Sequence, residues 1–298
     1  MIVLTRKKLW IGALVGFLLF VLIFITIFAP VSRKSSMEVI FSIKKGEGSR
    51  EIGYNLQRYG LIRSSPLFRM YAVITGVSFK LQAGDYLLSP SMSLFDMVRK
   101  FTTGDVIQEK LTIIEGWIIK DIEDYFAKKG RVIEISPDLE GYLFPDTYHI
   151  PNTASNKEIV GMMRENFEKK FNNDLRQETL RQGKTIAQII TMASLLEKEV
   201  KTLEDKKLVA GVLWKRLSIG MALQVDAAPI TYAVQGLPAG PISNPGLESI
   251  QAALYSTDNP YWYYLSTPEG PPGGEASKTI FSRTLGEHNI AKARYLKN

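Results

Sequence analysis

The stretch KTIAQIITMASLLEKEV, residues 184–200, predicts a helix around which the rest of the chain is organised. Thr185 is a suitable N-cap, and no Gly or Pro interrupts residues 186–200, where Ala, Leu, Met and Gln favour a helix. Apolar residues recur with the spacing of one helix face, at Ile186, Ile189, Ile190, Ala193 and Val200. We therefore expect this helix to pack against the core.

Two carboxylates, Glu197 and Glu199, end the predicted helix. At about 100° per residue, Glu197 falls on the stripe of Ile190, and Glu199 falls on the far side, near Met192. A carboxylate beside apolar surface is a candidate for a raised pKa, because burial disfavours the charged form. A carboxylic acid that stays protonated at neutral pH can assist the cleavage of a glycosidic bond. The alternative is the charged end of an ordinary helix.

The composition excludes several kinds of chemistry. The 298 residues allow about two domains plus accessory segments, and an apolar content of 45% is enough for a substantial core. The chain has no Cys, which excludes disulfides and thiolate chemistry. Its two histidines, His149 and His288, are far apart in sequence, so we expect no metal site and no cofactor.

An uncharged apolar segment, residues 9–28, predicts a membrane-spanning helix. Arg6, Lys7 and Lys8 precede it and favour a cytoplasmic N-terminus. A cleavable signal peptide is the alternative, but the run is long and no A-x-A site follows it. We expect a single-pass protein of the inner (cytoplasmic) membrane, with its body on the extracytoplasmic side.

A net charge of +7 indicates an anionic partner. Nucleic acid is not expected for a body outside the cytoplasm, whereas anionic lipid headgroups or an anionic wall polymer would fit. A generic basic surface without a specific partner is the alternative.

The remaining pattern predicts an α+β fold with short connections. Strands are expected at residues 38–44, 81–88 and 261–265, and a loop is expected before residues 279–282. Helices are expected at residues 49–59, 65–75, 93–102, 156–171, 203–217, 247–255 and 285–296. A break is expected at Asn172 and Asn173.

A weak internal repeat lies at an offset of 70 residues, where FSIKKGEGSREIGYNLQRYG (41–60) aligns with LTIIEGWIIKDIEDYFAKKG (111–130). Each copy reads as a strand, a Gly turn, and a helix stopped by Gly. Chance similarity between two strand–turn–helix segments is the alternative.

Five motifs in order carry a resemblance to one family. They are EGYLFPDTY (140–148), MASLLEKE (192–199), RLSIGMALQVD (216–226), GLPAGPISNPG (236–246) and the aromatic YWYYLS (261–266). Together they resemble the membrane-anchored endolytic murein transglycosylases of the MltG/YceG type, and the resemblance covers nearly the whole chain.

The resemblance implies an enzyme that cuts peptidoglycan glycan strands internally and leaves 1,6-anhydro-N-acetylmuramoyl ends. It implies a cytoplasmic tip and anchor at residues 1–36, a LysM-like and strand–helix repeat region at 37–136, and a mixed α+β catalytic domain at 137–298. It also implies that Glu199 is the catalytic residue, acting first as acid and then as base. Glu197 then becomes a candidate support residue with an unidentified partner.

Other polar residues in the matched motifs are candidates for contacts with the sugars or their N-acetyl groups. These substrate-binding candidates are Glu140, Asp146, Gln224, Asp226 and Asn244. The aromatic candidates for stacking on sugar rings are Tyr142, Tyr148 and Tyr232. For each of them, a capping, turn or core role is the alternative.

The sequence departs from the family pattern in one place. Family members often carry about twenty more residues before the GLP loop, whereas here Ala233, Val234 and Gln235 lead directly into Gly236. This departure keeps two alternatives to an enzyme open: a non-catalytic peptidoglycan-binding protein, and a scaffold that contacts cell-wall synthesis proteins.

Overall fold

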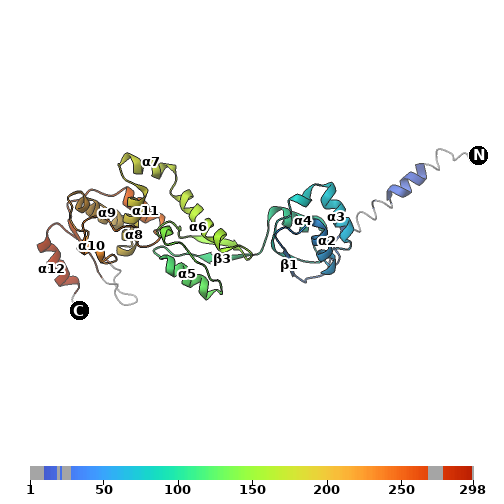
Figure 1. Ribbon diagram of the computed structural model, residues 1–298, viewed down its shortest axis with the longest axis horizontal. Helices are drawn as coiled ribbons and strands as arrows, with labels where there is room; N and C mark the ends of the chain where they lie inside the picture. Colours follow the sequence, from blue (N-terminus) through green and yellow to red (C-terminus); the bar gives the residue numbers. More distant parts are fainter. Residues whose placement is uncertain (1–9, 19–20, 22–27, 268–277, 297–298) are drawn as a thin grey trace, which may run out of the picture. The chain divides into compact units, whose positions relative to one another are not determined.

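The computed structural model describes residues 10–18, 21, 28–267 and 278–296 of the chain. Two compact units are present, residues 1–110 with 149–154 and residues 111–148 with 155–298. Each unit has its own apolar core. The mixture of helices and small two-stranded sheets confirms the predicted α+β class (Figure 1). The three-part functional division expected from the sequence stays a prediction.

The first unit has the strand–helix–helix–strand order expected from the sequence. Its elements are β1 (Val39–Ile43), α2 (Ser49–Arg58), α3 (Ser65–Ile74), the 3-10 helix η1 (Val77–Phe79), β2 (Gly84–Leu88) and α4 (Leu94–Thr103). Strands β1 and β2 pair antiparallel, with Phe41 opposite Tyr86. Alternation along β1 turns Phe41 inward, where it packs in the core with Phe68, Tyr86 and Phe101.

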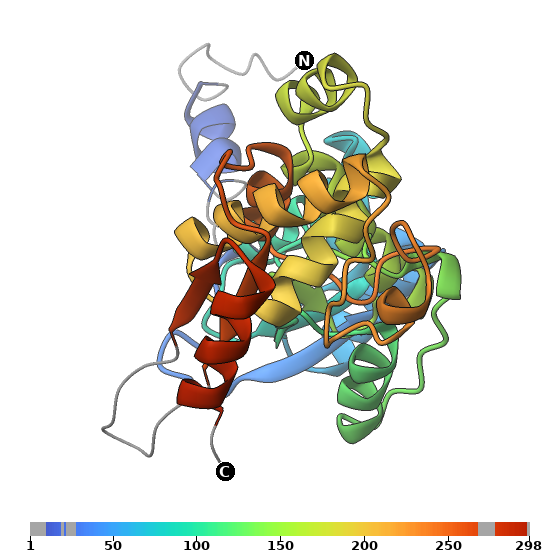
Figure 2. The same ribbon diagram turned by 90° about the vertical axis from the view of Figure 1, so that its left-hand side faces the viewer.

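The second unit is mainly helical. Its elements, with two strands at the boundary between the units, are β3 (Gln108–Thr112), α5 (Ile119–Lys128), the 3-10 helix η2 (Pro137–Leu139), β4 (Thr147–Pro151), α6 (Asn156–Lys170), α7 (Asn173–Arg181), α8 (Ile186–Glu199), α9 (Leu203–Ser218), α10 (Ile230–Ala233), α11 (Leu247–Leu254), β5 (Tyr263–Ser266), β6 (Thr279–Ser282) and α12 (Leu285–Tyr295). Strand β3 pairs with β4, and β5 pairs antiparallel with β6. Helix α8 packs against α11 and α9, and Figure 2 shows β5, β6 and α12 in red on one side of these helices.

The internal repeat is present in the backbone. Helices α2 and α5 begin and end 70 residues apart. The turn glycines Gly46 and Gly116 have φ of 86° and 80°, and Gly60 and Gly130, which follow the helices, have φ of 67° and 77°. These left-handed conformations are ones that side chains disfavour, so the matched glycines serve the same turns in both copies.

The predicted break lies between α6 and α7, which are separated by residues 171 and 172, and the helix α7 that follows it was not predicted. Asn172 is its N-cap, and its side-chain oxygen accepts a hydrogen bond from the N–H of Leu175 at 3.1 Å. Asn favours both loops and helix caps, so Asn172 marked the break but did not reveal the helix that begins after it.

The predicted membrane-spanning helix is not found. Among the described residues, no helix is both long and apolar enough to cross a bilayer. The expected single-pass placement in the inner membrane is corrected accordingly. Residues 9, 19–20 and 22–27 of the predicted span lie outside the described residues.

Candidate active site

The middle two turns of helix α8 are buried on all sides, and the two carboxylates lie at its C-terminal end. Thr185 caps its start, accepting from the N–H of Gln188, whose side chain accepts from the N–H of Thr185 in return. Every side chain from residue 189 to residue 196 is buried. Because both faces of the helix contact protein, the face on which each glutamate lies does not tell which of Glu197 and Glu199 is buried.

Glu199 has both carboxylate oxygens held by hydrogen bonds. Its Oε1 accepts from the N–H of Ala227 at 3.0 Å, and its Oε2 accepts from the hydroxyl of Tyr264 at 3.3 Å. Its backbone carbonyl accepts from the hydroxyl of Ser266 at 3.0 Å. The side chain is half-buried. Two segments distant in sequence therefore fix a carboxyl group that keeps part of its surface exposed.

The surroundings of Glu199 favour its protonated form. Burial raises the pKa of the Glu199 carboxyl, and the nearby charge of Asp226 raises it further. Hydrogen bonds from the N–H groups of Ala227 and Asp226 and from the Tyr264 hydroxyl oppose this, but the net pKa shift is upward. The Tyr264 hydroxyl has a pKa well above its usual range, because it is buried and lies beside Glu199. It therefore stays a hydrogen-bond donor.

Asp226 and Tyr232 form an exposed pair beside Glu199. The Tyr232 hydroxyl donates to the Asp226 carboxylate. That hydrogen bond, together with burial, raises the pKa of Tyr232 to about 12. Both side chains are exposed, so they can contact a bound ligand as well as each other.

The segment that supplies the Ala227 N–H is held from two sides. Thr231 lies behind it, where its hydroxyl accepts from the N–H of Val225 at 2.9 Å. Buried Arg216 donates to the Leu223 carbonyl at 2.6 Å and, through Nε, to the Trp262 carbonyl at 2.9 Å. One guanidinium thereby links this segment to the residue just before β5, the strand that carries Tyr264.

Gln224 lies in the same segment and has an unusual backbone. Its φ of 54° makes it the one non-glycine residue with a positive φ in the described part of the chain. Its side chain is exposed, and its N–H donates to the Thr231 carbonyl at 3.2 Å.

Both carboxylate oxygens of Glu197 are paired with groups of the protein, and the side chain is nearly closed to solvent. Its Oε1 lies 3.2 Å from the ammonium of Lys206, with side-chain exposures of 9% for Glu197 and 4% for Lys206. Its Oε2 accepts from the N–H of Gly246 at 2.9 Å and from the hydroxyl of Ser249 at 2.7 Å. These are the partners that the sequence could not identify, and they tie α8 to α9 and α11.

Asn244 and Glu140 join three loops of the second unit. Fully buried Asn244 accepts from the N–H of Leu143 at 3.0 Å and donates at 3.0 Å to Glu140 Oε1 and to the Trp117 carbonyl. Glu140 Oε2 accepts from the N–H of Ile119 at 3.0 Å. Burial raises the pKa of Glu140 despite these hydrogen bonds. The side-chain oxygen and nitrogen of Asn244 are therefore both hydrogen-bonded to other groups of the protein.

The Asp146 carboxylate is also hydrogen-bonded to neighbouring groups of the protein. It accepts from the N–H of Thr147 at 2.8 Å and from the side chain of Asn166 at 3.0 Å. Burial opposes ionisation, but these hydrogen bonds and the charge of Lys170 lower the pKa of Asp146. Tyr148 is buried and donates to the Phe144 carbonyl.

Of the residues singled out from the sequence, Glu199, Gln224, Asp226 and Tyr232 thus share one neighbourhood. Glu140 and Asn244 form a second cluster, and Asp146 packs toward α6. Sequence reasoning missed Tyr264, Ser266 and Arg216 as contacts of this site. Tyr264 and Ser266 are two residues apart on β5, so period-2 alternation was the signal that could have paired them on one face.

Comparison with known proteins places the chain in a family. The profile of the YceG-like family matches residues 41–230 and 230–294. The chain belongs to the YceG-like family. A crystal structure of a YceG-like protein from Listeria monocytogenes has a TM-score of 0.55 and 27% identity, covering 87% of this chain and 100% of that chain.

Two curated relatives carry a functional name. An endolytic murein transglycosylase of Bacillus subtilis is 27% identical, with 90% of this chain and 88% of that protein covered. An endolytic murein transglycosylase of Streptococcus pneumoniae is also 27% identical, with 88% of this chain and 60% of that protein covered.

Proposed function

We propose that the protein is an endolytic murein transglycosylase, a lyase that cuts glycosidic bonds within peptidoglycan strands. The observation that carries this proposal is Glu199, a half-buried carboxyl group with a raised pKa that two donors hold in place. Membership of the YceG-like family and the names of the relatives support it.

In the proposed reaction, protonated Glu199 gives its proton to the glycosidic oxygen between N-acetylmuramic acid and N-acetylglucosamine. The bond from that oxygen to the anomeric carbon breaks, and the 6-hydroxyl of the same muramic acid residue attacks the carbon. The resulting Glu199 carboxylate takes the proton of that hydroxyl and returns to its starting state. No water molecule is consumed, and the new end is a 1,6-anhydro sugar.

The N–H of Ala227 and the hydroxyl of Tyr264 have a defined part in this cycle. Both donate to the Glu199 oxygens, so they stabilise the carboxylate that forms after the first proton transfer. The Asp226 charge acts in the other direction and favours reprotonation. Asp226 and Gln224 are the residues proposed to contact the sugars, because both are exposed beside this carboxyl group. Glu140, Asp146 and Asn244 hold other loops of the second unit through the contacts described above.

For the first unit we propose a LysM-like role in holding a glycan strand. The support is its β1–α2–α3–β2 order, with the first and last strands paired antiparallel.

The test is digestion of purified peptidoglycan in water labelled with heavy oxygen, followed by mass spectrometry of the released fragments. We expect anhydro ends without label. Labelled reducing ends would instead indicate hydrolysis, which needs a second carboxylate, and Asp226 would be the candidate. Binding without release of any fragment would favour a non-catalytic peptidoglycan-binding protein.

A further inference from the structure

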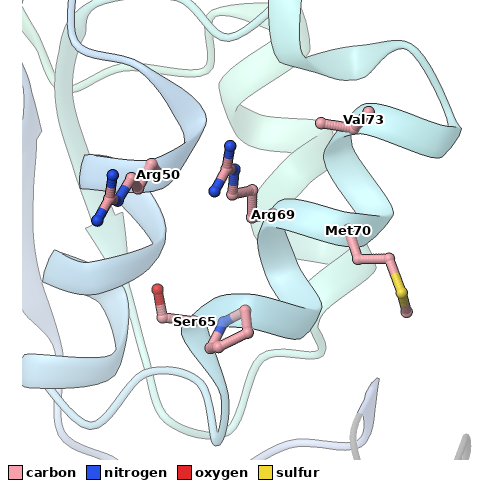
Figure 3. A pocket seen from close by; sticks show the side chains of 6 residues that line it. Arg50, Ser65, Arg69, Met70 and Val73 are labelled. Atoms are coloured by element: carbon pink, nitrogen blue, oxygen red, sulfur yellow. The ribbon is translucent and has the colours of Figure 1, made fainter.

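A groove between α2 and α3 in the first unit is unexplained by the proposed cleavage reaction. Its volume is about 450 Å³, and its lining residues are Arg50, Ser65, Pro66, Arg69, Met70 and Val73. Figure 3 shows Arg50 on one helix and Arg69 on the other, with Ser65 and Pro66 at one end of the space between them. The volume falls within the range of small-ligand sites.

The two arginines are available to a ligand. Both are exposed, and neither side chain makes a hydrogen bond or ion pair with another of the described residues. No acidic side chain is among the residues that line the groove. Both arginines line the groove, and a guanidinium group favours a carboxylate or a phosphate, which it can bind through two parallel hydrogen bonds.

The rest of the lining is apolar and not aromatic. Met70 and Val73 are 50% and 61% exposed, so their apolar surface is open to a ligand. Sugar rings commonly stack on aromatic side chains, and none lines this groove. The groove therefore fits an anionic group attached to small apolar groups better than it fits a neutral glycan.

We propose that this groove binds the peptide branch of peptidoglycan, through its carboxylates and the methyl groups of its alanines. The inference rests on the proposed function, which makes peptidoglycan the substrate. The arginines hold the carboxylates, and Met70 and Val73 cover the methyl groups. The site would let the protein distinguish strands that carry peptides from bare glycan.

The test uses the full chain and the free tetrapeptide L-Ala-γ-D-Glu-L-Lys-D-Ala. Binding is measured by calorimetry and by changes in the backbone amide signals. We expect saturable binding with signal changes centred on α2 and α3. Arg50→Gln and Arg69→Gln should each weaken it about tenfold, the loss of roughly one charge-assisted hydrogen-bonded pair. Arg58→Gln is the matched control, because Arg58 is exposed on α2 but does not line the groove, and it should bind normally.

Three outcomes would overturn the proposal. They are no binding of the tetrapeptide, equal binding of an analogue with both carboxylates amidated, or equally tight binding of inorganic phosphate alone. The tetrapeptide has no glycosidic bond, so this result does not depend on cleavage. A protein that binds the tetrapeptide but cuts no peptidoglycan would refute the proposed function and leave this site standing.

Discussion

Glu197 and Glu199 lie two positions apart on α8 and have different neighbours. Glu197 is paired with the Lys206 ammonium and accepts two further hydrogen bonds, in a site that is nearly closed to solvent. Glu199 lies near the like charge of Asp226 and keeps part of its surface exposed. The first arrangement suits a structural ion pair, and the second suits a group that exchanges a proton with a ligand.

Replacing each glutamate by glutamine should separate these roles. Glu199→Gln cannot transfer a proton, so release of anhydro fragments should fall by about 10⁴-fold, the upper end for general acid–base catalysis, while the fold stays intact. Glu197→Gln leaves buried Lys206 without its counter-charge and should lower the free energy of unfolding by roughly 3–5 kcal/mol. Folded molecules of the Glu197→Gln variant should still release anhydro fragments. Fragment release and thermal unfolding check both, and an active Glu199→Gln protein beside a folded, inactive Glu197→Gln protein would reverse the assignment.

Two neighbours of Glu199 should move the pH profile of cleavage in opposite directions. The protonated acid starts the reaction, so activity falls as pH rises through the pKa of Glu199. Asp226 raises that pKa, and Asp226→Asn should therefore move the alkaline limb to lower pH. The Tyr264 hydroxyl lowers it, and Tyr264→Phe should move the limb to higher pH. Cleavage rates measured across pH decide this, and an unchanged limb in both variants would mean that another group titrates.

At the scale of elements, α9 approaches the loop after α11 so closely that there is no room for a side chain at Gly211. A Cβ built on Gly211 would lie 2.1 Å from the carbonyl oxygen of Thr257. Thr257 in turn donates to the Lys207 carbonyl at 3.1 Å, so the loop cannot easily move away. Gly211 is therefore a packing glycine inside a helix.

Gly211→Ala should lower the free energy of unfolding by roughly 1–3 kcal/mol, because the added methyl group overpacks this contact. Gly161→Ala on α6 is the matched control, since nothing lies within 4 Å of its added Cβ. That change should stabilise the protein by roughly 0.5–1 kcal/mol through helix propensity alone. Denaturant unfolding of both variants checks the pair, and a shift of the same sign in both would contradict the packing explanation.

Elements with a strong local signal were predictable from the sequence. Helix α8 has a capping residue and an unbroken apolar run, and it formed within one residue of the expected bounds at its C-terminus. Helix α7 lacked such a signal, because Asn172 reads equally as a loop residue. Long-range pairs such as Glu197 with Lys206 depend on how helices pack, which periodicity does not encode. The role of Asn244 was hidden for the same reason.

At the scale of the whole molecule, hydropathy alone misled the placement of the N-terminal segment. An uncharged run of adequate length predicted a spanning helix, but among the described residues no helix is both long and apolar enough to cross a bilayer.

The net charge of +7 yields a prediction for the whole molecule. Peptidoglycan that carries peptide carboxylates is anionic, so added salt should screen its attraction to the protein. KM for such peptidoglycan should rise with ionic strength, while kcat stays nearly constant because Glu199 acts within the bound complex. Initial rates at increasing sodium chloride check this, and a KM independent of salt would show that the basic surface does not contribute to substrate capture.

The left-handed backbone at Gln224 has a consequence for which sequences this position tolerates. A side chain in that conformation costs about 1 kcal/mol relative to glycine, and the cost is borne by every folded molecule whether or not a ligand is present. The Gln224 side chain is exposed and makes no hydrogen bond with another described residue, so we expect it to offset this cost only through contacts with a bound ligand.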